Sequence, residues 1–441
     1  MSNGAGMNRR RFCGALAGAS CAPLGLAPLS RVFAAPPEYS GRLLVVLQLD
    51  GGWDVTSLCD PKTNQPGEPE INHWARRHDI ETAGNIAYAP FASNRDLFSR
   101  HHRRMLVING VDAQTNSHTT GVLHNWSGRN AAGLPTLSAL FAARHSPVAP
   151  LAYLSFGGFA DTARLIRYNR LDDHSALMQL LDPAATGPDG PRFRSEAELS
   201  RVQRYQRAAL ERRLARETLT PRQRENLRAY LNARSTRDAF HRLQAILPPE
   251  DQFLEDTELP GLSWPSDLMR QIQLTLLSFK AGVGSASDLF FSGFDTHSRH
   301  DEQHESLFKH LAQAVDYLWN YAGELGIADR ITLVMGSDFG RTPHYNADDG
   351  KDHWPIGSYI IMEEDPPWGN RVVGITDGGH NAQKINPVTL QRDDSGGTLI
   401  YPKHVHHALR RHLDLEAFAQ SRRMGFGLTE HVDFFNPAKM S

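Results

Sequence analysis

The sequence predicts an α/β protein, a three-layer α/β/α sandwich on a mostly parallel sheet with a helical insertion. Short apolar runs without polar alternation recur along the chain, as in strands that are buried on both faces. Amphipathic helical patterns separate several of these runs. Glycine, aspartate and histidine follow the runs, where strands would end in loops.

The amino terminus is predicted to be an export signal rather than part of this fold. Its "RRRF" motif fits the twin-arginine pattern, and a short stretch of Ala, Gly, Leu and Pro follows. Small residues at Val32 and Ala34 predict a mature chain that begins near Ala35. We therefore expect a signal over residues 1–34, the twin-arginine translocase as a transient partner, and a periplasmic or secreted protein. The apolar stretch is too short for a stable membrane anchor.

The composition indicates a globular protein and argues against nucleic-acid binding. The 441 residues are 40% apolar and 22% charged, as in soluble globular proteins. A formal charge of −2 gives no support for nucleic-acid binding. Two of the three cysteines lie in the signal, so Cys59 alone cannot form an internal disulfide. A lipoprotein cut before Cys21 is an alternative to cleavage near Ala35.

The elements of the domain, residues 35–441, are predicted in chain order. Its strands are Arg42–Asp50, Arg104–Gly110, Leu151–Gly158, Ser287–Gly293, Arg330–Gly336 and Ser358–Met362. A long helix with an apolar stripe is expected between His304 and Gly326. An arginine-rich helical insertion or cap is expected at about 195–250, broken at Pro221. Its arginines would either attract an anionic substrate or form a solvated face, and we favour the solvated face.

Acids and imidazoles follow four of the predicted strands. In open α/β sheets, ligands bind at the carboxyl ends of the strands. Each Asp taken alone is more often a turn or cap residue. Together they form one candidate metal-binding set, consisting of Asp50, Asp295, His297, Asp338, Asp352 and His353.

Close carboxylates raise each other's pKa unless a cation holds them. Mixed Asp and His ligands suit zinc, whereas magnesium, manganese or calcium would suit an oxygen-rich set. Six candidates could hold one or two divalent ions, and two ions can assist the displacement of an ester.

The segment "TNSHTTGVLHNW" offers a nucleophile at the start of a helix. The hydroxyl of Ser117 would lie near free backbone amides and the positive end of the helix dipole. The alternative is that Asn116 or Ser117 simply caps the helix. Arg341 either binds an oxyanion of the substrate or forms a structural salt bridge. His300 and His304 follow His297 at helical spacing. One of them is a further ligand, or both lie on an exposed helix face, and we favour the exposed face.

The chain also resembles a known family. The export signal with "LVVLQLDGGWD", "GFDTHSRHDEQH" and "SDFGRTP…KDHW" resembles the exported bacterial family catalogued as domain of unknown function 1501, itself similar to the alkaline phosphatase and sulfatase superfamily. The resemblance extends from about Arg42 to the helix near Leu415.

This resemblance implies an alkaline-phosphatase-like fold and particular roles. It implies a metal-binding acid at Asp50 or Asp54. It assigns Asp295, His297, Asp338 and His353 to the metals, with Asp352 as a ligand or just outside the ligand set. The nucleophile would start a helix, at Ser117 or, if the helix slides, at His118 or Thr119.

These observations predict an exported metal-dependent hydrolase of a phosphate or sulfate ester, with a small anionic ester as substrate. One alternative is a non-catalytic exported binding or assembly protein that keeps the fold. A metal-dependent phosphomutase is a further, weaker alternative.

Overall fold

The computed structural model describes residues 38–171, 177, 181, 186–187, 190–191, 195–216, 218–234, 237–427 and 429–436. The predicted export signal and the predicted start near Ala35 lie outside the described residues. No helix in the described ranges combines the length and apolarity that a bilayer crossing would require.

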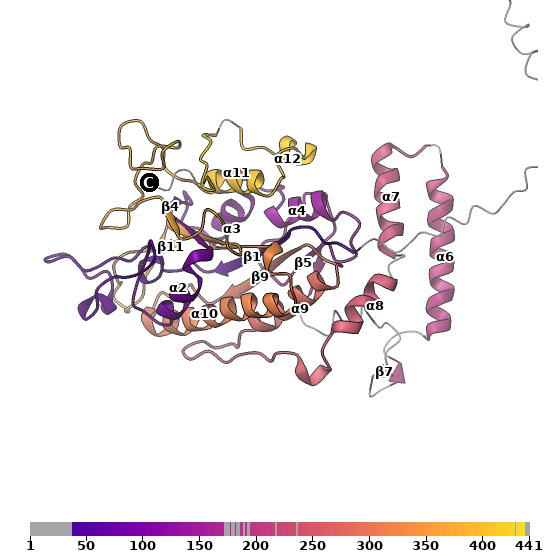
Figure 1. The fold of residues 1–441 in the computed structure, drawn as a ribbon, viewed down its shortest axis with the longest axis horizontal. Coiled ribbons are helices and arrows are strands. Elements are labelled where there is room, and N and C mark those ends of the chain that lie inside the picture. The colour runs from indigo at the N-terminus through magenta and orange to yellow at the C-terminus, as the bar shows by residue number, and fades with distance from the viewer. Residues whose placement is uncertain are drawn as a thin grey trace, which may run out of the picture. The chain divides into compact units, whose positions relative to one another are not determined.

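The core of the domain is an eight-stranded sheet (Figure 1). In spatial order its strands are β14 (Arg371–Val373), β4 (Met105–Asp112), β13 (Ile356–Met362), β10 (Ile331–Ser337), β1 (Leu43–Asp50), β9 (Ala286–Ser292), β5 (Tyr153–Ser155) and β6 (Asn169–Arg170). All neighbouring pairs are parallel except those of β13, which runs antiparallel to both β10 and β4. The sheet is thus mostly parallel, as predicted.

All six predicted strands are present, and they form the centre of this sheet. The apolar runs lack alternation because helices cover both faces. Leu43 and Val45 of β1 pack into one hydrophobic cluster, whereas Leu44 and Val46 pack into another on the opposite face. The sequence did not predict that β13 would run against its neighbours, because an apolar run carries no information on strand direction.

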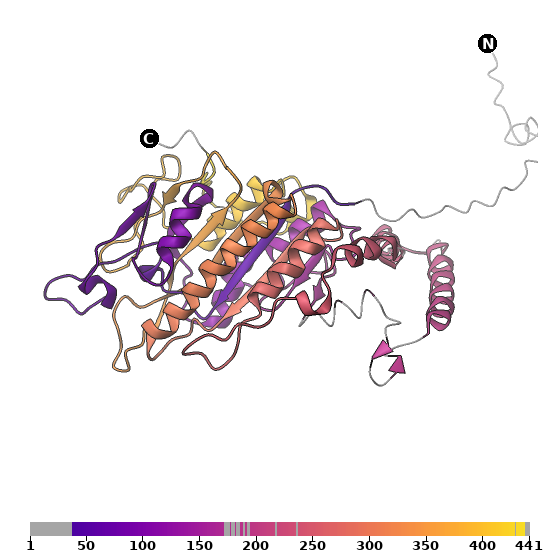
Figure 2. The same cartoon turned by 60° about the horizontal axis from the view of Figure 1, so that its bottom comes forward.

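Two helical layers enclose the sheet. Figure 2 shows the long helices of one layer side by side across the sheet. This layer contains α2 (Asn94–His101), α9 (Leu268–Lys280) and α10 (His300–Glu324). The other layer contains α3 (His118–Ser127), α4 (Leu137–His145) and α11 (Pro402–His412). The predicted three-layer sandwich is confirmed, and α10 begins four residues before the predicted helix start.

The segment predicted as a helical insertion contains three helices, α6 (Glu196–Leu214), α7 (Pro221–Arg234) and α8 (Arg237–Ile246). Ser195 and Glu198 form a capping box at the start of α6. Pro221 is the first residue of α7, where its missing N–H costs no helical hydrogen bond. Helix α8 packs through Ala239 and Leu243 against the hydrophobic cluster that includes part of α9.

The remaining elements are short. They are η1 (Val55–Ser57), η2 (His73–Arg76), β2 (Glu81–Ala83), β3 (Ile86–Tyr88), η3 (His102–Arg104), β7 (Thr186–Gly187), β8 (Gly190–Pro191), η4 (Glu250–Gln252), η5 (Ala328–Arg330), β11 (Gly340–Arg341), β12 (His353–Trp354) and α12 (Ala419–Arg423).

One edge of the sheet collects most of the predicted chemistry. Strands β1, β9 and β10 end there, and α3 follows the end of the parallel strand β4. Because β13 is antiparallel, its amino end reaches the same edge and brings β12 with it.

Candidate metal centre

Four side chains converge at this edge, and we call them the imidazole cluster. They are His118, Asp295, His297 and His353. His118 is the first residue of α3, and His353 begins β12. Asp295 and His297 lie in the loop between β9 and α10. Three separate segments of the chain therefore contribute to one small volume.

The Nε2 atoms of the three imidazoles point toward one another. His353 Nε2 lies 3.1 Å from His118 Nε2 and 3.0 Å from His297 Nε2. Asp295 Oδ1 lies 3.1 Å from His353 Nε2 and 3.0 Å from His297 Nε2. Asp295 Oδ2 lies 3.5 Å from His118 Nε2. Asp295 and His353 thus belong to two overlapping groups of three candidate ligands, one with His118 and the other with His297.

The opposite ring nitrogen of each imidazole is held by an acceptor. The acceptors of the Nδ1–H groups are Asp338 Oδ2 for His118 at 2.5 Å, Asp352 Oδ1 for His297 at 2.7 Å, and the Asn116 carbonyl for His353 at 2.8 Å. A hydrogen bond at Nδ1 fixes the ring orientation and directs the Nε2 lone pair toward the cluster. The arrangement is that of histidines which bind a metal through Nε2.

The charges in the cluster favour a cation. Hydrogen bonds to Asp295 and Asp338 raise the pKa of His118 to about 9, so its ring carries a proton near neutral pH when no metal is bound. Burial works to raise the pKa of Asp295, but hydrogen bonds from His118 and Arg341 outweigh it and hold this pKa below the ordinary range. A divalent ion could replace the His118 proton.

The donor set fits zinc. Ligand atoms held about 2.0–2.1 Å from a tetrahedral zinc ion lie roughly 3.3 Å from one another. The ligand atoms of the imidazole cluster are separated by 3.0 to 3.5 Å in the pairs described above. Imidazole-rich sets favour zinc over magnesium or calcium, which prefer oxygen.

The other predicted ligands lie around the cluster. Asp338 is fully buried and accepts hydrogen bonds from His118 and from Ser337 Oγ at 2.8 Å, so it orients the His118 ring. Asp352 does the same for His297. Asp50, at the end of β1, is half-buried; burial and then repulsion from Asp338 raise its pKa.

The guanidinium of Arg341 contacts the imidazole cluster through Asp295. Its side chain is fully buried, and Nη2 forms an ion pair with Asp295 Oδ1 at 2.5 Å. The guanidinium also donates to the carbonyl oxygens of Gly51, Gly52 and Lys351. These contacts match the salt bridge that was the alternative to binding of a substrate oxyanion.

The candidate nucleophile Ser117 occupies the N-cap position of α3 and is exposed. Within the described part of the chain, its hydroxyl caps no backbone N–H of the helix. The next residue, His118, belongs to the imidazole cluster, and Thr119 is exposed. Of the three residues considered for the nucleophile, His118 thus has the contacts of a metal ligand.

The expectation of an exposed face for His300 and His304 is wrong. Both are fully buried at the start of α10, where they contact Asp54. Helical spacing alone did not reveal this, because the burying partner lies almost 250 residues earlier in the chain.

Sequence reasoning also missed Lys351 and the place of His118 in the imidazole cluster. Lys351 is a fully buried lysine whose ammonium pairs with Asp54. The available signal was its place directly before Asp352 and His353, in a loop already singled out.

Comparison with known proteins assigns the chain to a family. The model of the family described as "Protein of unknown function (DUF1501)" matches residues 42–364. No curated protein matches the sequence. Solved structures similar to it include Ps i-CgsB in complex with k-i-k-neocarrahexaose, with 6% identity, a TM-score of 0.36, and coverage of 90% of this chain and 76% of that one.

Two further similar structures are a sulfatase and a phosphatase. The 2-O GAG sulfatase BT1596 has 10% identity and a TM-score of 0.34, with coverage of 90% of this chain and 75% of that one. A mutant of TAB5 alkaline phosphatase with Mg bound has 8% identity and a TM-score of 0.32, with coverage of 76% of this chain and 94% of that one.

Proposed function

The chain belongs to the DUF1501 family, whose description assigns no function, and we propose that it is a metal-dependent hydrolase of a phosphate or sulfate ester. The observation that carries this proposal is the imidazole cluster, whose three Nε2 atoms and one carboxylate converge while the Nδ1 atoms are held from behind. A divalent ion bound here would replace the His118 ring proton and accept the lone pairs of all three Nε2 atoms.

The residues of the cluster have distinct roles in this proposal. His118, His297, His353 and Asp295 hold one or two divalent ions, with zinc as the expected metal. A bound divalent ion supplies a Lewis acid that polarises an ester oxygen and lowers the pKa of a coordinated hydroxyl or water. Arg341 fixes the Asp295 carboxylate through the ion pair described above.

Ser117 is the proposed nucleophile. Its hydroxyl is exposed and lies at the start of α3, directly before His118. Backbone N–H groups in the first turn of a helix are free to stabilise an anion that forms there. Attack by Ser117 Oγ on phosphorus or sulfur would form a bond from Oγ and break the bond to the ester oxygen. That oxygen leaves as the alcohol with the proton lost from Ser117, and water then hydrolyses the covalent ester.

We further propose that the protein acts after export, in the periplasm or outside the cell. The "RRRF" motif and the following small-residue stretch support this. Export in the folded state would allow the metal to be acquired before translocation.

Metal content and hydrolysis test the proposal together. The full-length protein is stripped with a chelator, reloaded with zinc and assayed with aryl phosphate and aryl sulfate esters. We expect near-stoichiometric zinc and turnover of one ester class. His353→Ala should abolish both, whereas His102→Ala, at the opposite end of β4 from α3, should change neither. A wild-type protein that retains no divalent ion after reloading contradicts the proposal.

Ser117→Ala separates two chemical routes. If Ser117 is the nucleophile, this variant retains zinc but loses turnover by about 100-fold or more. Retained turnover would instead indicate direct attack by water.

A second candidate is a metal-binding protein without turnover, and the placement of the cations favours it. Arg341 and Lys351, which flank the metal-binding loops, are both fully buried and paired with Asp295 and Asp54. Neither can contact an anionic substrate without losing its partner. Stoichiometric zinc without hydrolysis of either ester class would select this candidate.

A further inference from the structure

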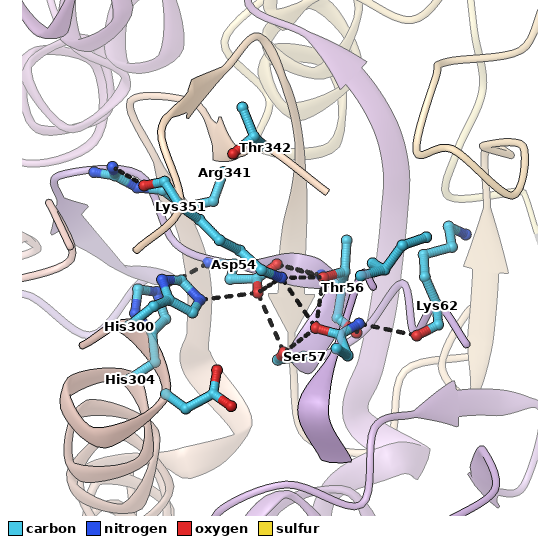
Figure 3. Close-up of polar contacts among 12 residues, drawn as sticks. Asp54, Thr56, Ser57, Lys62, His300, His304, Arg341, Thr342 and Lys351 are labelled. Carbon is cyan, nitrogen blue, oxygen red and sulfur yellow. Dashed lines mark hydrogen bonds and ion pairs between the residues drawn. The ribbon is translucent and has the colours of Figure 1, made fainter. Parts of the chain in front are cut away.

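A fully buried group of polar side chains surrounds Asp54, and we call it the Asp54 network. Its members are Asp54, Thr296, His300, His304 and Lys351, each at most 1% exposed. Figure 3 shows Lys351 and His300 pointing at the Asp54 carboxylate from two different segments of the chain.

The first arm of the network is Lys351. Its ammonium donates to Asp54 Oδ2 at 2.7 Å, to Asn72 Oδ1 at 3.0 Å and to Thr56 Oγ at 3.2 Å. All three N–H bonds of the ammonium thus have acceptors. Because Lys351 is only two residues before His353, this anchor fixes the backbone from which a member of the imidazole cluster extends.

The second arm runs through two histidines. His300 Nε2–H donates to Asp54 Oδ2 at 3.0 Å, and the Thr296 hydroxyl donates to His300 Nδ1 at 2.7 Å. The Asp54 backbone N–H donates to His304 Nε2 at 3.2 Å, which leaves His304 Nδ1–H to donate to the Thr296 hydroxyl at 3.2 Å. Every ring nitrogen in this arm has a partner when both rings are neutral. Thr296 stands between two members of the imidazole cluster in the sequence.

Backbone contacts join the two arms. The Lys351 N–H donates to the Thr296 carbonyl at 3.1 Å, and Arg341 Nη1 donates to the Lys351 carbonyl at 2.9 Å. The preceding residue, Gly350, packs so closely that a Cβ atom there would lie 2.0 Å from the carbonyl carbon and oxygen of His297. These contacts therefore fix the position of one loop, residues 293–299, relative to another, residues 342–352.

We propose that the Asp54 network positions the metal ligands: Asp54 and Lys351 are positioning residues that fix the loop carrying Asp295 and His297 and the loop leading directly to His353. The assignment of these three residues as metal ligands rests on the proposed function. The network itself contacts neither metal nor substrate, and it acts through the loops.

A purely stabilising role explains the network less well. A buried ion pair is weak evidence for stability, because well-packed apolar residues of similar volume often stabilise a fold equally or better. An ion pair that also forms several hydrogen bonds fixes the orientation of both side chains, because each hydrogen bond forms only when its donor and acceptor are correctly placed. Here these hydrogen bonds converge on the same two loops.

The test uses a paired substitution in the full-length protein, Asp54→Asn with Lys351→Met. The pair removes both charges at nearly constant volume, so neither charge remains buried alone. Asp288→Asn is the matched control, because Asp288 is equally buried but accepts hydrogen bonds from Ser138 of α4 and Tyr153 of β5. Zinc affinity is measured by titration against a competing chelator, well below the melting temperature of each variant.

We expect zinc affinity to fall about 10- to 100-fold in the paired variant, as for loss of groups that orient metal ligands, and to be unchanged in Asp288→Asn. Hydrogen exchange of the metal-free proteins gives a second readout. Amides of residues 295–300 and 341–353 should exchange faster in the paired variant, while those of β1 should not.

The outcomes distinguish this inference from the proposed function. Unchanged zinc affinity with unchanged exchange in both loops overturns the inference, even if the wild-type protein is an active zinc hydrolase. If the wild-type protein binds no zinc, the proposed function fails, and exchange still decides whether the network fixes the loops. If the paired variant does not fold, Gly350→Ala replaces it, because the added Cβ pushes the same loops apart without removing a charge.

Discussion

Asp54 and Asp288 are both completely buried carboxyl groups, yet the chain treats them in opposite ways. Burial opposes the ionisation of Asp54, but the ammonium of Lys351 and the hydrogen bond from His300 outweigh it and hold the pKa of Asp54 well below its ordinary value. Asp288 lies in the middle of β9; its donors among the described residues are uncharged, and burial raises its pKa to about 7.

The difference follows the position of each residue in the sheet. Asp288 receives hydrogen bonds from the hydroxyls of Ser138 and Tyr153, which tie α4 and β5 to β9. These contacts join elements that packing already holds together. Asp54 lies beyond the end of β1, where loops rather than regular elements must be placed. There an ion pair with several hydrogen bonds fixes the loops, which lack the regular backbone hydrogen bonds of a strand.

The largest expected difference is in the free energy of unfolding of two matched variants, Asp54→Asn and Asp288→Asn. Asp54→Asn leaves the Lys351 ammonium buried without its counter-charge, and we expect the free energy of unfolding to fall by about 3–5 kcal/mol at pH 7. Asp288→Asn keeps polar partners for both hydroxyls and should not lower it, because burial disfavours the ionised carboxylate that forms as pH approaches 7. Urea denaturation of both variants measures this. Equal effects would mean that Asp54 is no more dependent on charge pairing than Asp288.

The pH dependence of stability should differ in sign between the regions. The pKa of Asp288 is raised in the fold, so its contribution is fully present below about pH 4 and is lost as pH rises toward 7. The loss should be on the order of 3–4 kcal/mol, because the folded-state pKa lies roughly three units above the unfolded value. The contribution of Asp54 is instead present above about pH 4 and is lost as pH falls.

Urea denaturation between pH 4 and 8 checks this expectation. Asp288→Asn should remove the decline of stability between pH 4 and 7. A decline that persists unchanged in this variant would assign it to other groups.

The sequence predicted the region around Asp288 and the region around Asp54 to different extents. Strand β9 was predicted because its apolar run is local, and burial on both faces follows from that run alone. The loops at the carboxyl edge were singled out through Asp295, His297 and His353, since strand ends in a parallel sheet share one edge. The structure brings these three residues together.

The positions of His118 and Lys351 depend on contacts between distant parts of the chain, which no local sequence pattern encodes. His118 was considered as a nucleophile, whereas its Nε2 lies beside Asp295 and His353 from later in the chain. Lys351 was not singled out, because its buried partner, Asp54, lies 297 residues earlier. Separations of this kind are decided by the topology of the sheet, including the antiparallel direction of β13.

Removing the carboxylate behind His118 should cost less free energy than leaving the Lys351 ammonium without Asp54. Asp338→Asn weakens the hydrogen bond that orients His118, and we expect zinc affinity to fall about 10- to 100-fold. Asp288→Asn, the same chemical change at an equally buried site, should leave zinc affinity as in the wild type. Chelator competition at pH 7 measures both. A fall of similar size in both variants would indicate a general loss of structure.

The smallest expected effect is the dependence of zinc affinity on pH. Hydrogen bonds to Asp295 and Asp338 raise the pKa of His118 to about 9, so zinc must displace a proton from this ring near neutral pH. Affinity should therefore fall about tenfold, or about 1.4 kcal/mol, for each unit that pH decreases below 9. Titrations at pH 7 and 8 in buffers of different ionisation enthalpy would count the released proton. Asp338→Asn should reduce this dependence, because one of the two carboxylates that favour the protonated ring is gone, whereas Asp288→Asn should retain it. A zinc affinity that is constant between pH 7 and 8 would mean that His118 is not a ligand.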